Sequence, residues 1–196
     1  ASPCSPDNRG KPSIEPLRLP ALHQSGLLDS PPERAFDRLT ELACRLLTVP
    51  IALISLVDVE VAVDCQFLKS SQGLPTSWAM QRQMPHTVLC CQQVTLAKEP
   101  LVIDDVPRHP VFCHTLALPG FTLAAYLAVP LLAPDGQALG IFCVLDAQPR
   151  AWTPADTHTL QELSAVVVDE IALRVLSHER GAATLALQAS EEQVRL

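Results

Sequence analysis

The pattern that most restricts the fold of this sequence is a pair of apolar segments, residues 123–132 and 137–146, separated by a Pro-Asp-Gly turn at 134–136. Proline and glycine at those positions favour a reversal of the chain, so the two segments are predicted to pair as a β-hairpin. Residues 50–58 are apolar on both faces, as in a central strand, and residues 61–69 alternate as a half-buried strand does. The short gap between those two strands indicates a second antiparallel pair.

Helices are predicted before and between these strands. The first is expected to begin at a capping box over 30–33, with proline at the first helical position, and to end at Pro50. Its apolar residues form one stripe at helical spacing: Phe36, Leu39, Ala43 and Leu46. A shorter helix is predicted over 87–97 and one more strand over 100–105, whereas 70–86 is interpreted as a loop.

The last helix is predicted to begin at a cap followed by proline, Thr153-Pro154, and it carries two apolar stripes. One stripe consists of Leu160, Leu163, Val167, Ile171 and Val175, and the other of Val166, Leu173 and Leu176. Because two stripes exceed what one buried face requires, this helix is predicted to pack on its own sheet and also on a partner. The order of elements predicts an α+β fold, with an antiparallel sheet and terminal helices on one side.

Composition argues against several classes of function. The formal net charge is −7 and no basic patch is visible, which disfavours nucleic-acid binding. The longest apolar run, residues 121–133, is interrupted by Pro130 and is too short to cross a bilayer, so no membrane span is expected in this segment. Seven cysteines without a CxxC motif favour a reducing, cytoplasmic location. The proline-rich residues 1–20 are predicted to be a flexible leader.

Four segments in order carry a family resemblance: LLDSPPERAFDRLTELACRLLTVPIALISLVD, FLKSSQGL, EPLVIDD and APDGQALGIFCVLDAQPRAWT. Together they resemble a GAF domain, of the type at the N-terminus of bacterial sensor histidine kinases and cyclic-di-GMP signalling proteins. The resemblance implies a GAF domain over 21–176 and a helical signalling linker over 177–196. It also implies a homodimer through residues 33–48 and 154–190, and a PAS, kinase or cyclase domain downstream in the same chain.

The resemblance implies a ligand pocket on the face of the sheet opposite the terminal helices. A small ligand would bind there and the signal would pass through a dimeric C-terminal helix. Pocket candidates combine apolar walls with polar groups: Trp78, Cys91, Asp104, Phe112, Cys113 and Tyr126. Neither the ligand nor a cofactor is identified by the sequence.

The neighbouring thiols Cys90 and Cys91 raise the question of redox or metal chemistry. Free cysteine is among the most buried residue types, so packing at the edge of the cavity is the preferred interpretation. His86 with Cys90, and His109 with Cys113, are four residues apart and would share a helical face. A soft metal or a heme remains an alternative, although this spacing matches no standard metal-binding motif.

A second alternative is a bilin-binding photoreceptor. The Cys113-His114 pair, with Phe121 and Val129-Pro130 in register, resembles the chromophore attachment region of phytochrome-like GAF domains. A third alternative is a structural dimerisation spacer without a ligand. Catalysis by the module itself is not expected, since no nucleophile elbow, phosphate loop or HExxH motif occurs.

Overall fold

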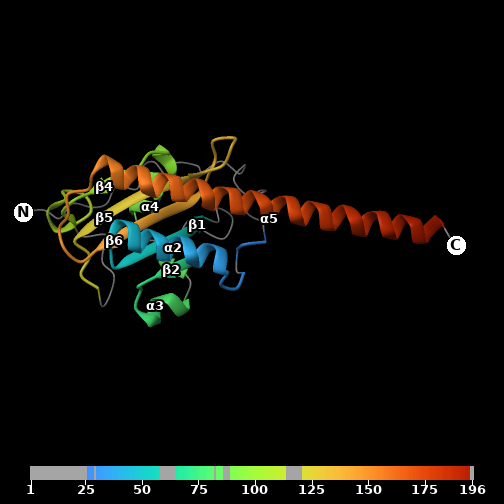
Figure 1. The fold of residues 1–196 in the computed structure, drawn as a ribbon, viewed down its shortest axis with the longest axis horizontal. Coiled ribbons are helices and arrows are strands. Elements are labelled where there is room, and N and C mark those ends of the chain that lie inside the picture. The colour runs from blue at the N-terminus through green and yellow to red at the C-terminus, as the bar shows by residue number, and fades with distance from the viewer. Residues whose placement is uncertain are drawn as a thin grey trace, which may run out of the picture.

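The computed structural model of this chain describes residues 26–28, 30–57, 65–81, 83–85, 89–113 and 121–194. Within these ranges six strands form one antiparallel sheet in the order β3-β2-β1-β6-β5-β4 (Figure 1). The strands are β1 (Ile51–Val57), β2 (Cys65–Gln72), β3 (Gln83–Pro85), β4 (Leu101–Ile103), β5 (Ala125–Leu132) and β6 (Ala138–Asp146). The predicted α+β fold with an antiparallel sheet is confirmed.

The two predicted strand pairs are confirmed. Strand β5 pairs with β6 from Ala125 opposite Asp146 to Leu132 opposite Ala138. In the turn between them, Gly136 has a φ of 80°, which favours glycine, and its N–H donates to the carbonyl of Ala133 at 2.8 Å. Strand β1 lies between β2 and β6, and its residues 51–56 are all buried, as a central strand requires.

The helices are α2 (Arg34–Leu47), α3 (Thr76–Gln81), α4 (Leu89–Ala97) and α5 (Pro154–Val194), with a 3-10 turn, η2 (Val106–Arg108). Helices α2 and α5 cover one face of the sheet, and α5 then continues well beyond the domain (Figure 1). Helix α4 covers the opposite face. None of the described helices has the length and apolar character that crossing a lipid bilayer requires.

The core under α2 and α5 follows the predicted helix periodicity. On α5 the first predicted stripe is buried from Leu160 through Ile171, against strand residues such as Leu127 and Val144. The second stripe points outward, with Leu173 58% exposed. Helix α5 is therefore apolar on two sides, and the described residues of the chain cover only one of them.

Several local predictions were wrong. Helix α2 begins at Arg34, its N-cap is Glu33, and no side chain caps it, so the predicted capping box does not form. Residue Leu46 is exposed, and the buried stripe of α2 is Phe36, Thr40, Ala43 and Leu47. Residues 70–86 are not only loop, because they contain the end of β2, helix α3 and strand β3.

Candidate functional site

Three thiols and a phenol gather between the sheet and α4. Cys90 and Cys91 lie in the first turn of α4 and are both buried, and Tyr126 and Cys143 lie on the neighbouring strands β5 and β6. Strand register explains the grouping: Cys143 pairs with Ala128, two residues from Tyr126, so Tyr126 and Cys143 are diagonal neighbours on one face. We call these four residues the thiol–phenol cluster.

The thiol–phenol cluster is buried, and its titratable groups favour their neutral forms. The Sγ atom of Cys91 lies 3.8 Å from the hydroxyl oxygen of Tyr126, within hydrogen-bond range for sulfur. Burial raises the pKa of Tyr126 well above its usual value, and the neighbouring Cys91 raises it further. Burial likewise raises the pKa values of Cys143 and Cys90. Because a thiolate is the reactive form of cysteine, these groups are poorly suited to nucleophilic or redox chemistry in the closed structure.

Residues of the 104–113 segment complete the wall of this face. Phe112 is buried in the same apolar cluster, whereas Cys113 is half-buried. The ring of His109 lies 4.8 Å from that of Phe112, and its Nδ1 atom accepts the backbone N–H groups of Val111 and Phe112. His109 thus organises the turn that places Phe112 against the sheet.

Asp104 does not join the thiol–phenol cluster. Its side chain is exposed, and its Oδ1 atom accepts the backbone N–H of Trp152 at 3.0 Å. The indole N–H of Trp152 in turn donates to the carbonyl of Ile103 at 3.2 Å. Asp104 therefore ties the end of β4 to the segment that leads into α5.

The structure brings together three of the six pocket candidates, namely Cys91, Phe112 and Tyr126. The side chain of Trp78 and residues His86 and His114 lie outside what the structure describes. The Cys113-His114 chromophore attachment therefore stays a prediction. Within the described ranges, no three His, Cys, Asp or Glu side chains converge as metal ligands would.

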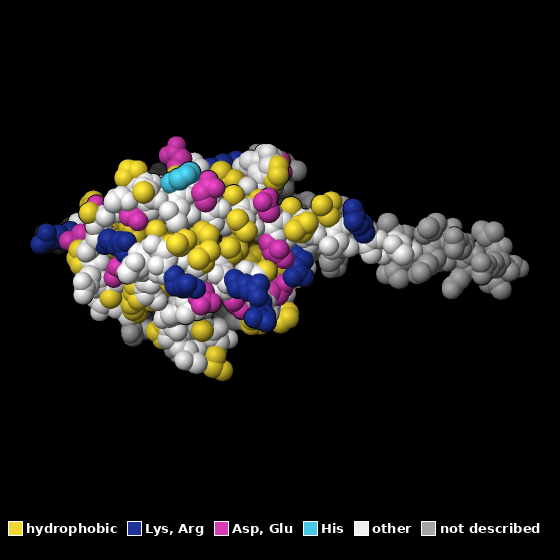
Figure 2. Space-filling view, viewed as in Figure 1, with side chains coloured by type: hydrophobic (Ala, Val, Ile, Leu, Met, Phe, Trp, Pro, Cys, Tyr) yellow, Lys and Arg dark blue, Asp and Glu magenta, His cyan; other side chains and the backbone are white. Residues whose placement is uncertain are grey.

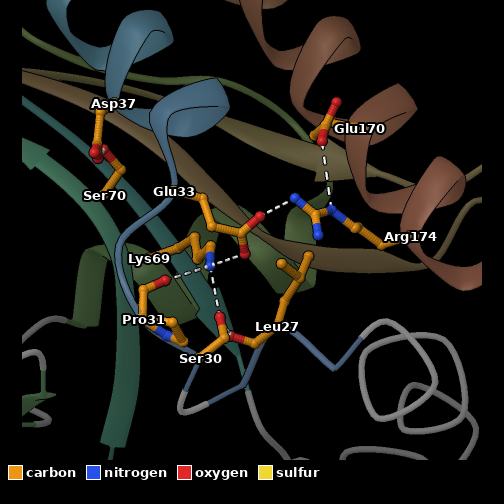
Figure 3. A network of polar contacts seen from close by, with 9 residues as sticks. All are labelled: Leu27, Ser30, Pro31, Glu33, Asp37, Lys69, Ser70, Glu170 and Arg174. Carbon is orange, nitrogen blue, oxygen red and sulfur yellow. Dashed lines mark hydrogen bonds and ion pairs between the residues drawn. The ribbon is translucent and has the colours of Figure 1, made fainter. Parts of the chain in front are cut away.

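A polar network that the sequence analysis missed lies on the opposite face of the sheet, where α2 begins (Figure 3). Lys69 on β2 is 1% exposed, and its ammonium donates to Ser30, to the carbonyl of Pro31 and to Glu33, the last at 2.7 Å. Strand alternation could have indicated its position, since Lys69 shares the parity of Phe67, which faces α2 and α5.

Glu33 extends this network to helix α5. Its second carboxylate oxygen forms an ion pair with Arg174 of α5, and Arg174 also contacts Glu170 at 3.5 Å (Figure 3). Arg174 lies one helical turn beyond Ile171, a buried core residue of α5. The network therefore joins β2, the start of α2 and the place where α5 leaves the domain.

The rate at which each thiol is alkylated is expected to decrease as its burial increases. Among the five cysteines whose burial the structure describes, we expect Cys113 to react first at pH 8 in the native protein and Cys44 more slowly, because burial raises the pKa of Cys44 to about 11. Cys90, Cys91 and Cys143 should react only on the timescale of unfolding. Peptide mapping by mass spectrometry after timed iodoacetamide exposure measures this order, with a urea-unfolded sample as control. Fast labelling of Cys91 in the native state would contradict the closed arrangement.

An antiparallel sheet with two helices on one face and a helix-covered apolar wall on the other defines a small α+β domain. Residues 31–171 match the GAF domain model. That match covers most of the chain, and the chain therefore belongs to the GAF domain family.

The chain is similar to a cyclic di-GMP phosphodiesterase of Pseudomonas aeruginosa. The two are 28% identical over 162 residues, which is 82% of this chain and 26% of the relative. The chain thus spans about a quarter of the length of this curated relative.

Solved structures show the same fold. The GAF domain of a phosphoenolpyruvate-protein phosphotransferase from Coxiella burnetii superposes with a TM-score of 0.63 at 21% identity, covering 84% of this chain and 96% of that one. The GAF domain of Thermosynechococcus elongatus PixJ, in its blue-light absorbing form, superposes with a TM-score of 0.59 at 17% identity. This match covers 87% of this chain and 96% of that one. At these identities the likeness establishes the fold alone.

Proposed function

We propose that this chain is the sensory module of a signal-transduction protein. A small ligand would bind on the sheet face that carries the thiol–phenol cluster, and the signal would leave through α5 paired with the α5 of a second copy. The similarity to a cyclic di-GMP phosphodiesterase supports an output domain of cyclic-dinucleotide signalling further along the same protein.

The observation that carries this proposal is the length of α5 and the apolar residues on its outward side. It is one helix of 41 residues that starts in the domain core and continues past it (Figure 1). Its outward side carries Val166, Leu173 and Leu176, each at least half exposed. The first two are seven residues apart and the last two are three apart, which is the spacing of a coiled-coil seam.

The apolar surface next to this seam supports the same arrangement. Leu42 and Leu46 of α2 are 37% and 56% exposed. Helix α2 lies beside α5 (Figure 1), and the space-filling view from the same side shows apolar side chains gathered over these two helices (Figure 2). Single exposed leucines need no explanation, but a row of them along two adjacent helices indicates an interaction surface. A parallel pair of α5 helices would cover this row and would let a change in packing travel along the helix.

Replacing Leu173 by glutamate is expected to separate the dimer. Burying a leucine contributes about 1.5–3 kcal/mol, and both subunits lose it, so Kd should rise at least about 100-fold. Sedimentation equilibrium of the intact chain measures this shift. Gln148→Glu adds the same charge on an exposed loop and should leave Kd unchanged. A wild-type chain that stays monomeric at high concentration would refute the relay.

A further inference from the structure

A second hollow lies away from the thiol–phenol cluster, at the edge of the sheet between α5 and the end of α4. Its volume is about 240 Å³. Its lining includes the apolar side chains of Pro130, Leu132, Ala165 and Val168 and the polar side chains of Lys98, Gln161 and Ser164. We call it the edge groove.

Unequal strand lengths create the edge groove. Strand β4 has three residues and pairs with β5 only from Tyr126 to Ala128, whereas β5 continues to Leu132. Beyond Ala128, the described residues provide no strand partner on that side of β5. Pro130 has no N–H, which makes this edge unsuitable for pairing with another strand. Small side chains on α5, Ser164 and Ala165, leave the space above it open.

Lys98 closes one end of this groove in an unusual backbone conformation. Its φ is 58°, and its N–H donates to the carbonyl of Val94 at 2.9 Å, which terminates α4. Glycine is the usual residue at such a left-handed helix end, because a side chain there is strained. Within the described part of the chain, the Lys98 ammonium has neither an ion-pair nor a hydrogen-bond partner. The chain thus carries a cation where conformation alone would favour glycine.

The remaining polar atoms of the groove restrict what can bind. The hydroxyl of buried Ser164 donates to the carbonyl of Leu160 at 2.8 Å, so its oxygen is left only as an acceptor. Gln161 contributes an uncharged amide, which can both donate and accept, and proline, leucine, alanine and valine side chains form the rest of the walls. One exposed cation at the rim of an apolar hollow complements a molecule with a single negative charge and an apolar body.

We propose that the edge groove binds a small carboxylate with a short apolar chain, its carboxylate paired with Lys98 and its chain against Pro130, Leu132 and Val168. The volume corresponds to about eight water molecules, so the ligand has about eight to ten non-hydrogen atoms. This site is independent of the proposed ligand face under α4. Because Ser164 and Ala165 belong to α5, an occupant would contact the same helix that carries the proposed relay.

Hexanoate is the probe for this proposal, and 1-hexanol is its uncharged match. Saturation-transfer NMR titrations of the intact chain should show saturable hexanoate binding by 20 mM, and 1-hexanol should bind at least about tenfold more weakly because it lacks the ionic contact. Hexylammonium should show no binding. Equal affinities for the acid and the alcohol, or no hexanoate binding by 20 mM, would overturn the proposal.

Two variants locate the binding. Lys98→Gly removes the cation and relieves the left-handed strain, so hexanoate affinity should fall to that of the alcohol while Tm stays equal or rises. Lys98→Arg should keep the affinity. Ala165→Phe is expected to fill the groove and abolish binding of both probes. Hexanoate binding at the wild-type affinity in Lys98→Gly, or any hexanoate binding in Ala165→Phe, would place the ligand elsewhere and refute the assignment.

Discussion

Replacing Glu33 by alanine is expected to lower the free energy of unfolding by about 3 kcal/mol, because it removes a carboxylate that forms an ion pair with a buried ammonium. The side chain of Lys69 is 0% exposed, and its ammonium lies 2.7 Å from the Glu33 carboxylate. Ser30 and Pro31 supply only neutral oxygens to that ammonium. Urea unfolding at a fixed protein concentration measures the change.

Matched variants distinguish the contribution of the buried Glu33–Lys69 pair from that of the exposed Glu33–Arg174 pair. Arg174 is 43% exposed, so Arg174→Ala should cost less than about 1 kcal/mol. Glu41→Ala removes the same charge from an exposed position of α2 and should change stability by less than about 0.5 kcal/mol. The double variant Glu33→Gln with Lys69→Met should recover most of the loss. A Glu33→Ala effect no larger than that of Glu41→Ala would mean that Glu33 does not compensate the lysine.

The periodicity of apolar residues predicted the main strands and helices of this fold, because buried residues recur at regular intervals along each element. The apolar strands at 51–57 and 138–146 and the inner stripe of α5 were recognisable for that reason. Helix starts were harder. The Ser30 to Glu33 motif has the residue types of a capping box, but Lys69, 36 residues away from Glu33, binds both side chains. A tertiary contact therefore overrides the local capping preference.

Only part of the candidate site followed from the sequence. Cys91, Phe112 and Tyr126 were proposed as apolar pocket residues, and the structure brings them together. Asp104 was grouped with them as a polar group of the pocket, yet its carboxylate accepts a hydrogen bond from the backbone of Trp152. The edge groove was not visible, since it depends on the mismatch in length between two paired strands. The left-handed backbone conformation of Lys98 could not be predicted either, because lysine is not a residue type that favours it.

Replacing Gly140 by alanine is expected to cost about 3 kcal/mol of unfolding free energy, at the upper end of the range for overpacking. A Cβ atom on Gly140 would lie 2.0 Å from the carbonyl oxygen of Ser55 and 3.0 Å from the Cα of Leu56. Both contacts are with backbone of the central strand β1, which is held between β2 and β6 and has little freedom to move. The pairing of β1 with β2 shifts register between Ile54 and Ser55, so Gly140 faces an irregular part of the ladder.

Gly181 provides the control, because an alanine side chain at that position would not clash with another part of the protein. It lies within α5, and a Cβ built on it meets no atom within 4 Å apart from its chain neighbours and the nearby backbone of its own helix. Gly181→Ala should therefore stabilise the helix by about 0.5–1 kcal/mol. Urea unfolding monitored by tryptophan fluorescence reports the domain, and circular dichroism at 222 nm reports α5 as well. If Gly140→Ala unfolds at the same urea concentration as wild type, strands β1 and β6 do not approach each other as closely as this register requires.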